Sequence, residues 1–84
     1  MSTKLHVGNI ASTVLEDDLQ ATFAKFGPVD TVEVARDSGT GVSKGFAIVA
    51  TARNEDASTA IGLLNFTQYA GRTIGVSANA DGFS

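Results

Sequence analysis

Apolar residues alternate with polar or small ones along four short segments of the chain. In the first segment, Leu5 and Val7 are separated by His6 and flanked by Lys4 and Gly8. A period of two is typical of a β-strand that places one face on a core. The four segments are residues 4–8, 31–35, 46–50 and 73–77. The sequence therefore predicts four strands.

Apolar residues at helical spacing occur twice between these segments, and each set predicts an amphipathic helix. The first set is Leu15, Leu19, Phe23 and Phe26, and the second is Ala57, Ala60, Ile61 and Leu64. We expect Thr13 and Glu16 to form a capping box at the start of the first helix, and Gly-Pro at 27–28 to end it. Asn54 and Asn65 are expected to cap the second helix.

The order strand, helix, strand, strand, helix, strand defines a fold class. It is the split βαβ repeat of a ferredoxin-like βαββαβ sandwich in the α+β class. It predicts a four-stranded antiparallel sheet, in the order 4-1-3-2, with two helices on one face. We expect residues 1–84 to form a single domain, with its core at about residues 4–78 and a loose tail at residues 80–84.

Composition excludes several classes of function. The chain has no cysteine and one histidine, so zinc knuckles and multi-histidine metal sites are excluded, and we expect no metal or cofactor. We expect no enzyme, because residues 10–14 lack the arginine and glycine-rich turn of a phosphate-cradling loop. The longest apolar run, residues 46–50, is too short to span a membrane. The N-terminus lacks the apolar region of a signal peptide, which predicts a cytoplasmic protein.

The predicted third strand breaks the rule that a sheet face without helices is polar. Phe46 and Ile48 project to the open face, and His6 joins them from the first strand. The first and third strands form the central pair of this fold, so the three side chains should cluster, flanked by Lys4 and Lys44. An exposed apolar cluster bordered by cations indicates an interaction site. Rings stack on unpaired bases and lysines meet phosphates, which favours single-stranded RNA.

The same two strands carry the motifs of a known family. Residues 5–10 (LHVGNI) and 44–51 (KGFAIVAT) resemble the six- and eight-residue RNP motifs of the RNA recognition motif (RRM) family. The resemblance, which covers residues 4–78, implies a single-stranded RNA partner, with single-stranded DNA as a further candidate. It places three residues of this chain at positions that are usually aromatic and stack on bases: His6, Phe46 and Ile48. The chain departs from the family at Ile48, which cannot stack, and at Phe66, which falls where glycine or asparagine commonly turns the chain.

The net charge of the chain and its distribution predict weak binding of RNA. The formal net charge is -3, from six basic and nine acidic residues. The excess of acidic residues lies on the predicted helices, so the charges of the rest of the chain sum to zero. We expect Lys44 and Lys4 to contact phosphates, with Arg36 as an auxiliary contact at the border of the sheet. A neutral face releases few counterions on binding RNA.

Two alternatives stay open from the sequence. The fold can instead bind a protein partner or a second copy of itself, which the net acidity and the missing aromatic at Ile48 favour. Phe46 can also be buried rather than open to a ligand, either in the core or beneath a folded-back tail that carries Phe83.

Overall fold

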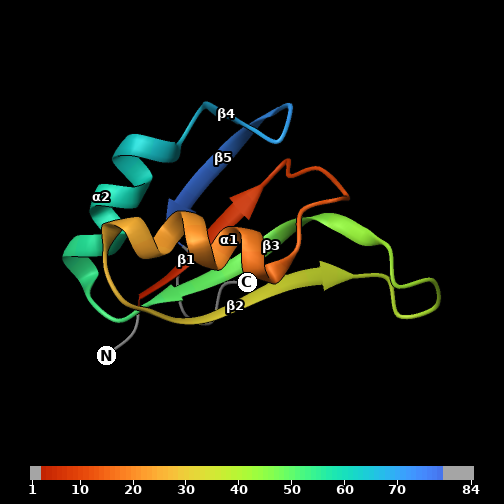
Figure 1. Ribbon diagram of the computed structural model, residues 1–84, viewed down its shortest axis with the longest axis horizontal. Coiled ribbons are helices and arrows are strands. Elements are labelled where there is room, and N and C mark those ends of the chain that lie inside the picture. Colours follow the sequence, from red (N-terminus) through yellow and green to blue (C-terminus); the bar gives the residue numbers. More distant parts are fainter. Residues whose placement is uncertain (1–2, 79–84) are drawn as a thin grey trace.

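The computed structural model describes residues 3–78, which form a curved sheet with helices packed against it (Figure 1). The elements follow the predicted order, with one strand more than expected. They are β1 (Thr3–Gly8), α1 (Glu16–Phe23), the 3₁₀ helix η1 (Ala24–Phe26), β2 (Val29–Arg36), β3 (Ser43–Thr51), α2 (Asn54–Leu64), β4 (Thr67–Tyr69) and β5 (Arg72–Ala78). No helix among these residues is long and apolar enough to cross a membrane. The expected loose tail, with Phe83, lies outside the described residues.

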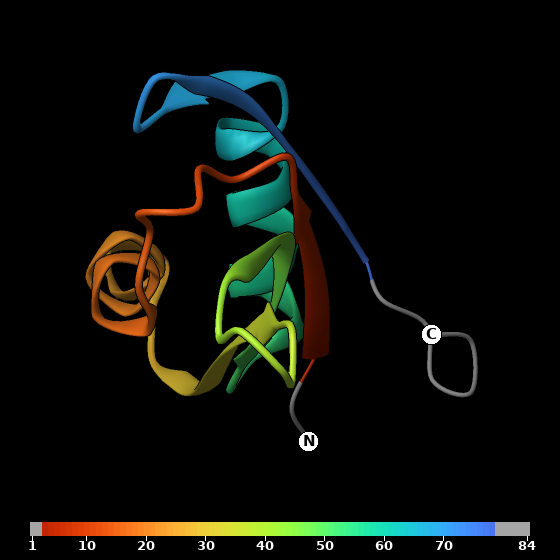
Figure 2. The same cartoon turned by 90° about the vertical axis from the view of Figure 1, so that its right-hand side faces the viewer.

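The sheet is antiparallel, with the strand order β2-β3-β1-β5-β4. The four long strands have the predicted 4-1-3-2 arrangement, in which β5 is the predicted fourth strand. Both helices lie on the same side of the sheet (Figure 2). The ferredoxin-like fold class is therefore confirmed.

The predicted count of four strands is wrong, because β4 adds a fifth. This three-residue strand pairs with the start of β5 in a tight hairpin, with Tyr69 opposite Arg72. The two turn residues both have positive φ, 52° at Ala70 and 85° at Gly71, as a two-residue hairpin of this twist requires. Three residues are too few for a period of two to be recognised.

The predicted caps are partly wrong. Helix α1 begins at Glu16 after Leu15, whose N–H donates to the carboxylate of Asp18 at 3.0 Å, so Thr13 and Glu16 form no capping box. Asp18 accepts that bond because it stands at the third helical position, within reach of the unpaired N–H. Helix α2 begins at Asn54 itself, so the N-cap is Arg53 and not Asn54, and it ends at Leu64 with Asn65 as the C-cap, as predicted.

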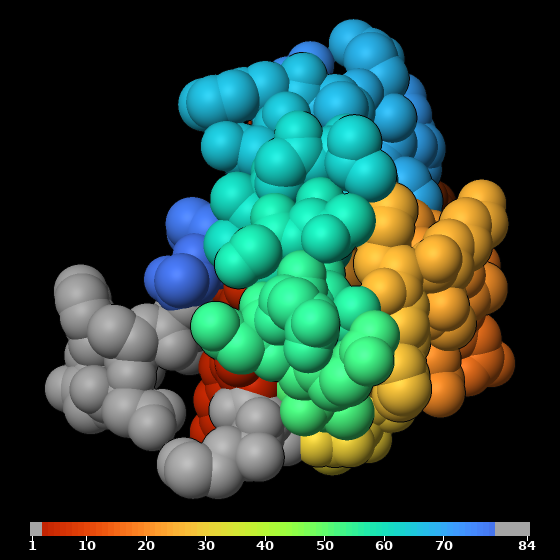
Figure 3. Space-filling model, turned by 90° about the vertical axis from the view of Figure 1, so that its left-hand side faces the viewer, coloured from red at the N-terminus to blue at the C-terminus, as the bar shows by residue number. Residues whose placement is uncertain are grey.

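The core lies between the helices and one face of the sheet. The strands contribute Leu5, Val7, Ala47 and Val49, which lie two residues apart on β1 and β3 and are fully buried. The helices contribute the other side of the core, with Leu19, Phe23, Ala57 and Ala60. Toward the left-hand side of Figure 1, α2 lies against the orange and yellow segment that contains η1 and leads into β2 (Figure 3). Since successive side chains of a strand point to opposite faces of the sheet, the neighbours of these core residues, His6, Phe46 and Ile48, face away from the helices.

Candidate nucleic-acid interface

A row of four side chains crosses the sheet on the face away from the helices. His6 of β1 has Ile48 of β3 and Ser77 of β5 as its direct cross-strand partners. Glu33 of β2 is in turn the partner of Ile48. Residues directly opposite each other in neighbouring strands share a face, so all four belong to the open surface. The open face thus carries an aliphatic side chain and an imidazole at its centre, with polar groups at both edges.

Phe46 belongs to this open face and not to the core. It precedes the buried residue Ala47 and is partly exposed, and its cross-strand partner is Gly8. Its phenyl ring stacks on the imidazole of His6, with ring centroids 5.3 Å apart and an interplanar angle of 21°. The two rings therefore form one continuous aromatic surface that spans β1 and β3. Burial of Phe46 beneath the helices is excluded.

The absence of a side chain at Gly8 allows this contact. A Cβ atom built at position 8 would lie 3.2 Å from Cε1 of His6, closer than ordinary van der Waals contact. The imidazole therefore lies over the Gly8 backbone, beside Phe46. Glycine in a strand often marks such a close approach, and here the approaching group is a ring of the same strand.

Two lysines lie near opposite ends of the aromatic surface. Lys4 is exposed two residues before His6, at a position that pairs with Ala50. Lys44 is exposed at the other end, next to Gly45, whose φ of 89° bends β3 just before Phe46. Neither lysine forms an ion pair with another residue in the range 3–78. Both charges are therefore free to meet phosphates.

Arg36, the sixth predicted site residue, is held elsewhere. Its guanidinium donates to the carboxylate of Glu16 on α1 at 2.7 Å, and the same carboxylate accepts a hydrogen bond from the N–H of Val34. Hydrogen bonds lower the pKa of Glu16, chiefly one from its own backbone N–H and then that of Arg36. Arg36 thus ties edge strand β2 to α1 and does not join the cluster around His6. Its charge is paired with that of Glu16, and its expected role as an auxiliary phosphate contact stays a prediction.

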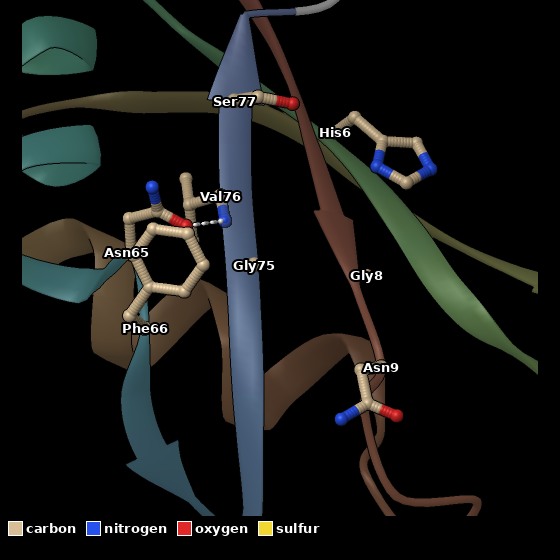
Figure 4. Close-up of a pocket in the computed structure, with 8 residues that line it drawn as sticks. All are labelled: His6, Gly8, Asn9, Asn65, Phe66, Gly75, Val76 and Ser77. Atoms are coloured by element: carbon tan, nitrogen blue, oxygen red, sulfur yellow. Dashed lines mark hydrogen bonds between the residues drawn. The ribbon is translucent and has the colours of Figure 1, made fainter.

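A groove lies beside the aromatic surface, over β1 and β5 (Figure 4). Its volume is about 440 Å³. Its one signal in the sequence is Phe66, which departs from a family pattern. The lining residues are His6, Gly8, Asn9, Asn65, Phe66, Gly75, Val76 and Ser77. No group of three or more metal-ligating side chains occurs in the described part of the chain.

Comparison with known proteins identifies the class to which this fold and open face belong. The family model for the RNA recognition motif matches residues 5–75. The chain belongs to the RNA recognition motif family, as the two RNP-like segments predict.

Similar proteins agree with this assignment. An uncharacterized RNA-binding protein of Schizosaccharomyces pombe is 38% identical over 76 residues, which cover 90% of this chain and 26% of that protein. The structure of RNA-binding protein PG1 matches with a TM-score of 0.92 at 32% identity, over 95% of this chain and 96% of the other. A Sxl-lethal protein–RNA complex matches with a TM-score of 0.90 at 30% identity, over 98% of this chain and 49% of the other. The chain spans about a quarter of the length of the curated relatives it matches.

Proposed function

We propose that the open sheet face binds short single-stranded RNA, weakly and with little sequence specificity. The observation that carries the proposal is the stack of His6 on Phe46, since it presents an aromatic surface away from the core. Every base has a π-face, so such a surface accepts bases regardless of sequence. Membership of the RNA recognition motif family supports RNA as the ligand. Single-stranded DNA offers the same bases and phosphates and is a further candidate.

Some residues of the open face contact bases, and others contact phosphates. Phe46 and His6 stack on bases, and each stacked base contributes about 1–3 kcal/mol. Ile48 lies beside His6 in the cross-sheet row and offers apolar contact to a sugar or a base edge. Lys44 and Lys4 attract phosphates from the two ends of the face.

Three features keep the affinity low. One of the three stacking positions is the aliphatic Ile48, so one platform is lost. The carboxylate of Glu33 is exposed opposite Ile48 and repels a phosphate that approaches this side. Few counterions are released by two free lysines. We therefore expect a dissociation constant nearer micromolar than nanomolar, which rises with salt.

An amide NMR titration with short single-stranded RNA at low salt tests the proposal. We expect shifts at β1 and β3, around His6 and Phe46, and little change on the exposed surfaces of α1 and α2. Silence at β1 and β3 up to millimolar RNA would contradict the proposal. The alternative, a protein-binding module or homodimer, is favoured by the exposure of Leu63 and Phe66 at 60% and 80%. It predicts shifts that depend on protein concentration instead. The cytoplasmic localisation expected from the sequence stays a prediction.

A further inference from the structure

Phe66 has an unusual backbone conformation for a large aromatic residue. Its φ is 63°, in the left-handed region that favours glycine and asparagine. This conformation turns the chain from α2 into β4, and the Phe66 N–H donates to the carbonyl of Ile74 at 2.8 Å. The turn needs the conformation but not the ring, because 80% of the residue is exposed to solvent. A strained residue whose side chain adds nothing to the core suggests a role in binding.

The ring stands at one side of the groove over β1 and β5. In the close-up, Phe66 lies along one side of β5 and His6 lies beyond β1 on the other (Figure 4). Between them lie Gly75 and its direct cross-strand partner Gly8, which add no side chain of their own to the floor of the groove. The volume of about 440 Å³ lies within the range of about 300–1,000 Å³ of pockets that hold small ligands. The groove therefore has space for a flat, aromatic group against a ring.

Polar groups at the groove suit the edges of a base. The Oδ1 atom of Asn65 accepts the Val76 N–H at 2.9 Å, which fixes the orientation of the amide. Its Nδ2 group and the hydroxyl of Ser77 make no hydrogen bond within residues 3–78, so both can pair with a ligand. The amide of Asn9, by contrast, donates to the carbonyl of Thr73 at 2.7 Å and accepts from Arg72 at 2.8 Å. Asn9 thus fixes the end of the groove.

We propose that this groove is a further nucleotide site, in which one unpaired base stacks on Phe66 over the backbone of Gly75. The site adjoins the aromatic surface through His6, which lines the groove and also stacks on Phe46. A bound strand therefore crosses the sheet from Phe46 over β1 and β5 to Phe66. This inference rests on the proposed function, because the base reaches Phe66 as part of an RNA bound at His6 and Phe46.

Binding of oligonucleotides of two lengths tests the site. We compare the wild type with F66N and F66Y on a dinucleotide and a tetranucleotide, at one low salt concentration. Asparagine tolerates the left-handed conformation, so F66N removes the ring without adding backbone strain. We expect F66N to weaken tetranucleotide binding by at least about fivefold, the lower end for one stacked base, and to leave the dinucleotide unchanged. F66Y, which keeps a ring, retains both affinities.

A second substitution alters the same groove and leaves Phe66 unchanged. In G75V, valine places a side chain on the floor of the groove, where the nearest atom to a new Cβ is Asn65 Oδ1 at 3.8 Å. Valine also favours a strand, so we expect G75V to fold with an unchanged or higher melting temperature. It should weaken tetranucleotide binding as F66N does.

The possible results separate this inference from the proposed function. Unchanged tetranucleotide affinity in F66N and G75V, with RNA still bound at β1 and β3, overturns the further site alone. No RNA binding by the wild type overturns both. If F66N instead abolishes self-association in sedimentation while RNA affinity is unchanged, Phe66 serves a protein contact and the nucleotide site is wrong.

Discussion

The imidazole of His6 lies over the backbone of Gly8, close enough that a Cβ atom at position 8 would come within 3.2 Å of Cε1. Gly8 is also the cross-strand partner of Phe46, the residue on which the imidazole stacks. The aromatic surface therefore depends on a glycine that contributes no ring of its own. Positions of this kind set the geometry of a platform without contributing a stacking group.

Gly8→Ala tests this dependence. The added methyl group forces the imidazole to move by a few tenths of an ångström or to change rotamer, which disturbs its stack on Phe46. We expect RNA affinity to fall by about 0.5–1.5 kcal/mol, within the range for a lost aromatic pair. Aromatic NMR shifts of His6 and Phe46 report the movement, and fluorescence anisotropy with a labelled oligonucleotide reports the affinity.

Gly62→Ala is the matched control for that substitution. Gly62 lies in α2, and a Cβ atom there has no neighbour within 4 Å. We expect it to raise the free energy of unfolding by about 0.5–1 kcal/mol, because alanine favours a helix. Its RNA affinity stays at the wild-type value. Equal affinity losses in both variants would show that the effect of Gly8→Ala does not come from the platform.

Salt dependence separates the free lysine from the paired arginine. We expect Lys44→Ala to weaken binding about equally for all RNA sequences and to reduce the slope of log affinity against log salt by about one. Arg36→Ala should leave that slope unchanged, because the guanidinium is already bound to Glu16. Titrations of both variants at several salt concentrations measure the slopes. A reduced slope of log affinity against log salt in Arg36→Ala, with no reduction in Lys44→Ala, would show that Arg36 contacts a phosphate.

The ionised carboxylate of Glu16, which pairs with Arg36, predicts that the stability of the fold depends on pH. The pKa of Glu16 is lowered from its ordinary value of 4.5 by its hydrogen bonds, so ionised Glu16 stabilises the folded state. This stabilisation is complete above pH 4.5 and is lost as the pH falls through the lower pKa of the folded state. We expect Glu16→Gln to melt below the wild type at pH 7, with the difference shrinking below pH 4.5. A constant difference across acid melts would exclude this linkage.

Much of the fold follows from periodicity, because one face of each long strand is buried. The alternation of Leu5 and Val7 with His6 assigns β1 its core face, and the same alternation orients Phe46 and Ile48 outward. Strand β4 has only three residues and turns through Ala70 and Gly71 instead of the asparagine-glycine pair that signals such hairpins. Its existence depends on pairing with β5, which sequence spacing does not report.

The site is only partly predictable for a similar reason. Alternation places His6 and Phe46 on one face, but their stacking depends on side-chain rotamers and on the space at Gly8. Arg36 borders the sheet as expected, yet its partner Glu16 is twenty positions away in sequence, and only the packing of α1 brings them together. Phe66 stands out in the sequence as a departure, while the groove beside it forms only in the folded sheet.

The comparison of Phe46→Ala with Ile48→Phe tests the central claim most directly. Both are measured against the same RNA oligonucleotide at the same salt concentration, together with their melting temperatures. Phe46→Ala should weaken binding by about 1–3 kcal/mol, the contribution of one stacked base, while the protein stays folded. Ile48→Phe should strengthen binding, because it adds a ring beside His6 at the third stacking position. If Phe46→Ala leaves affinity unchanged while the melting temperature collapses, Phe46 serves the core and the open face is not an RNA-binding platform.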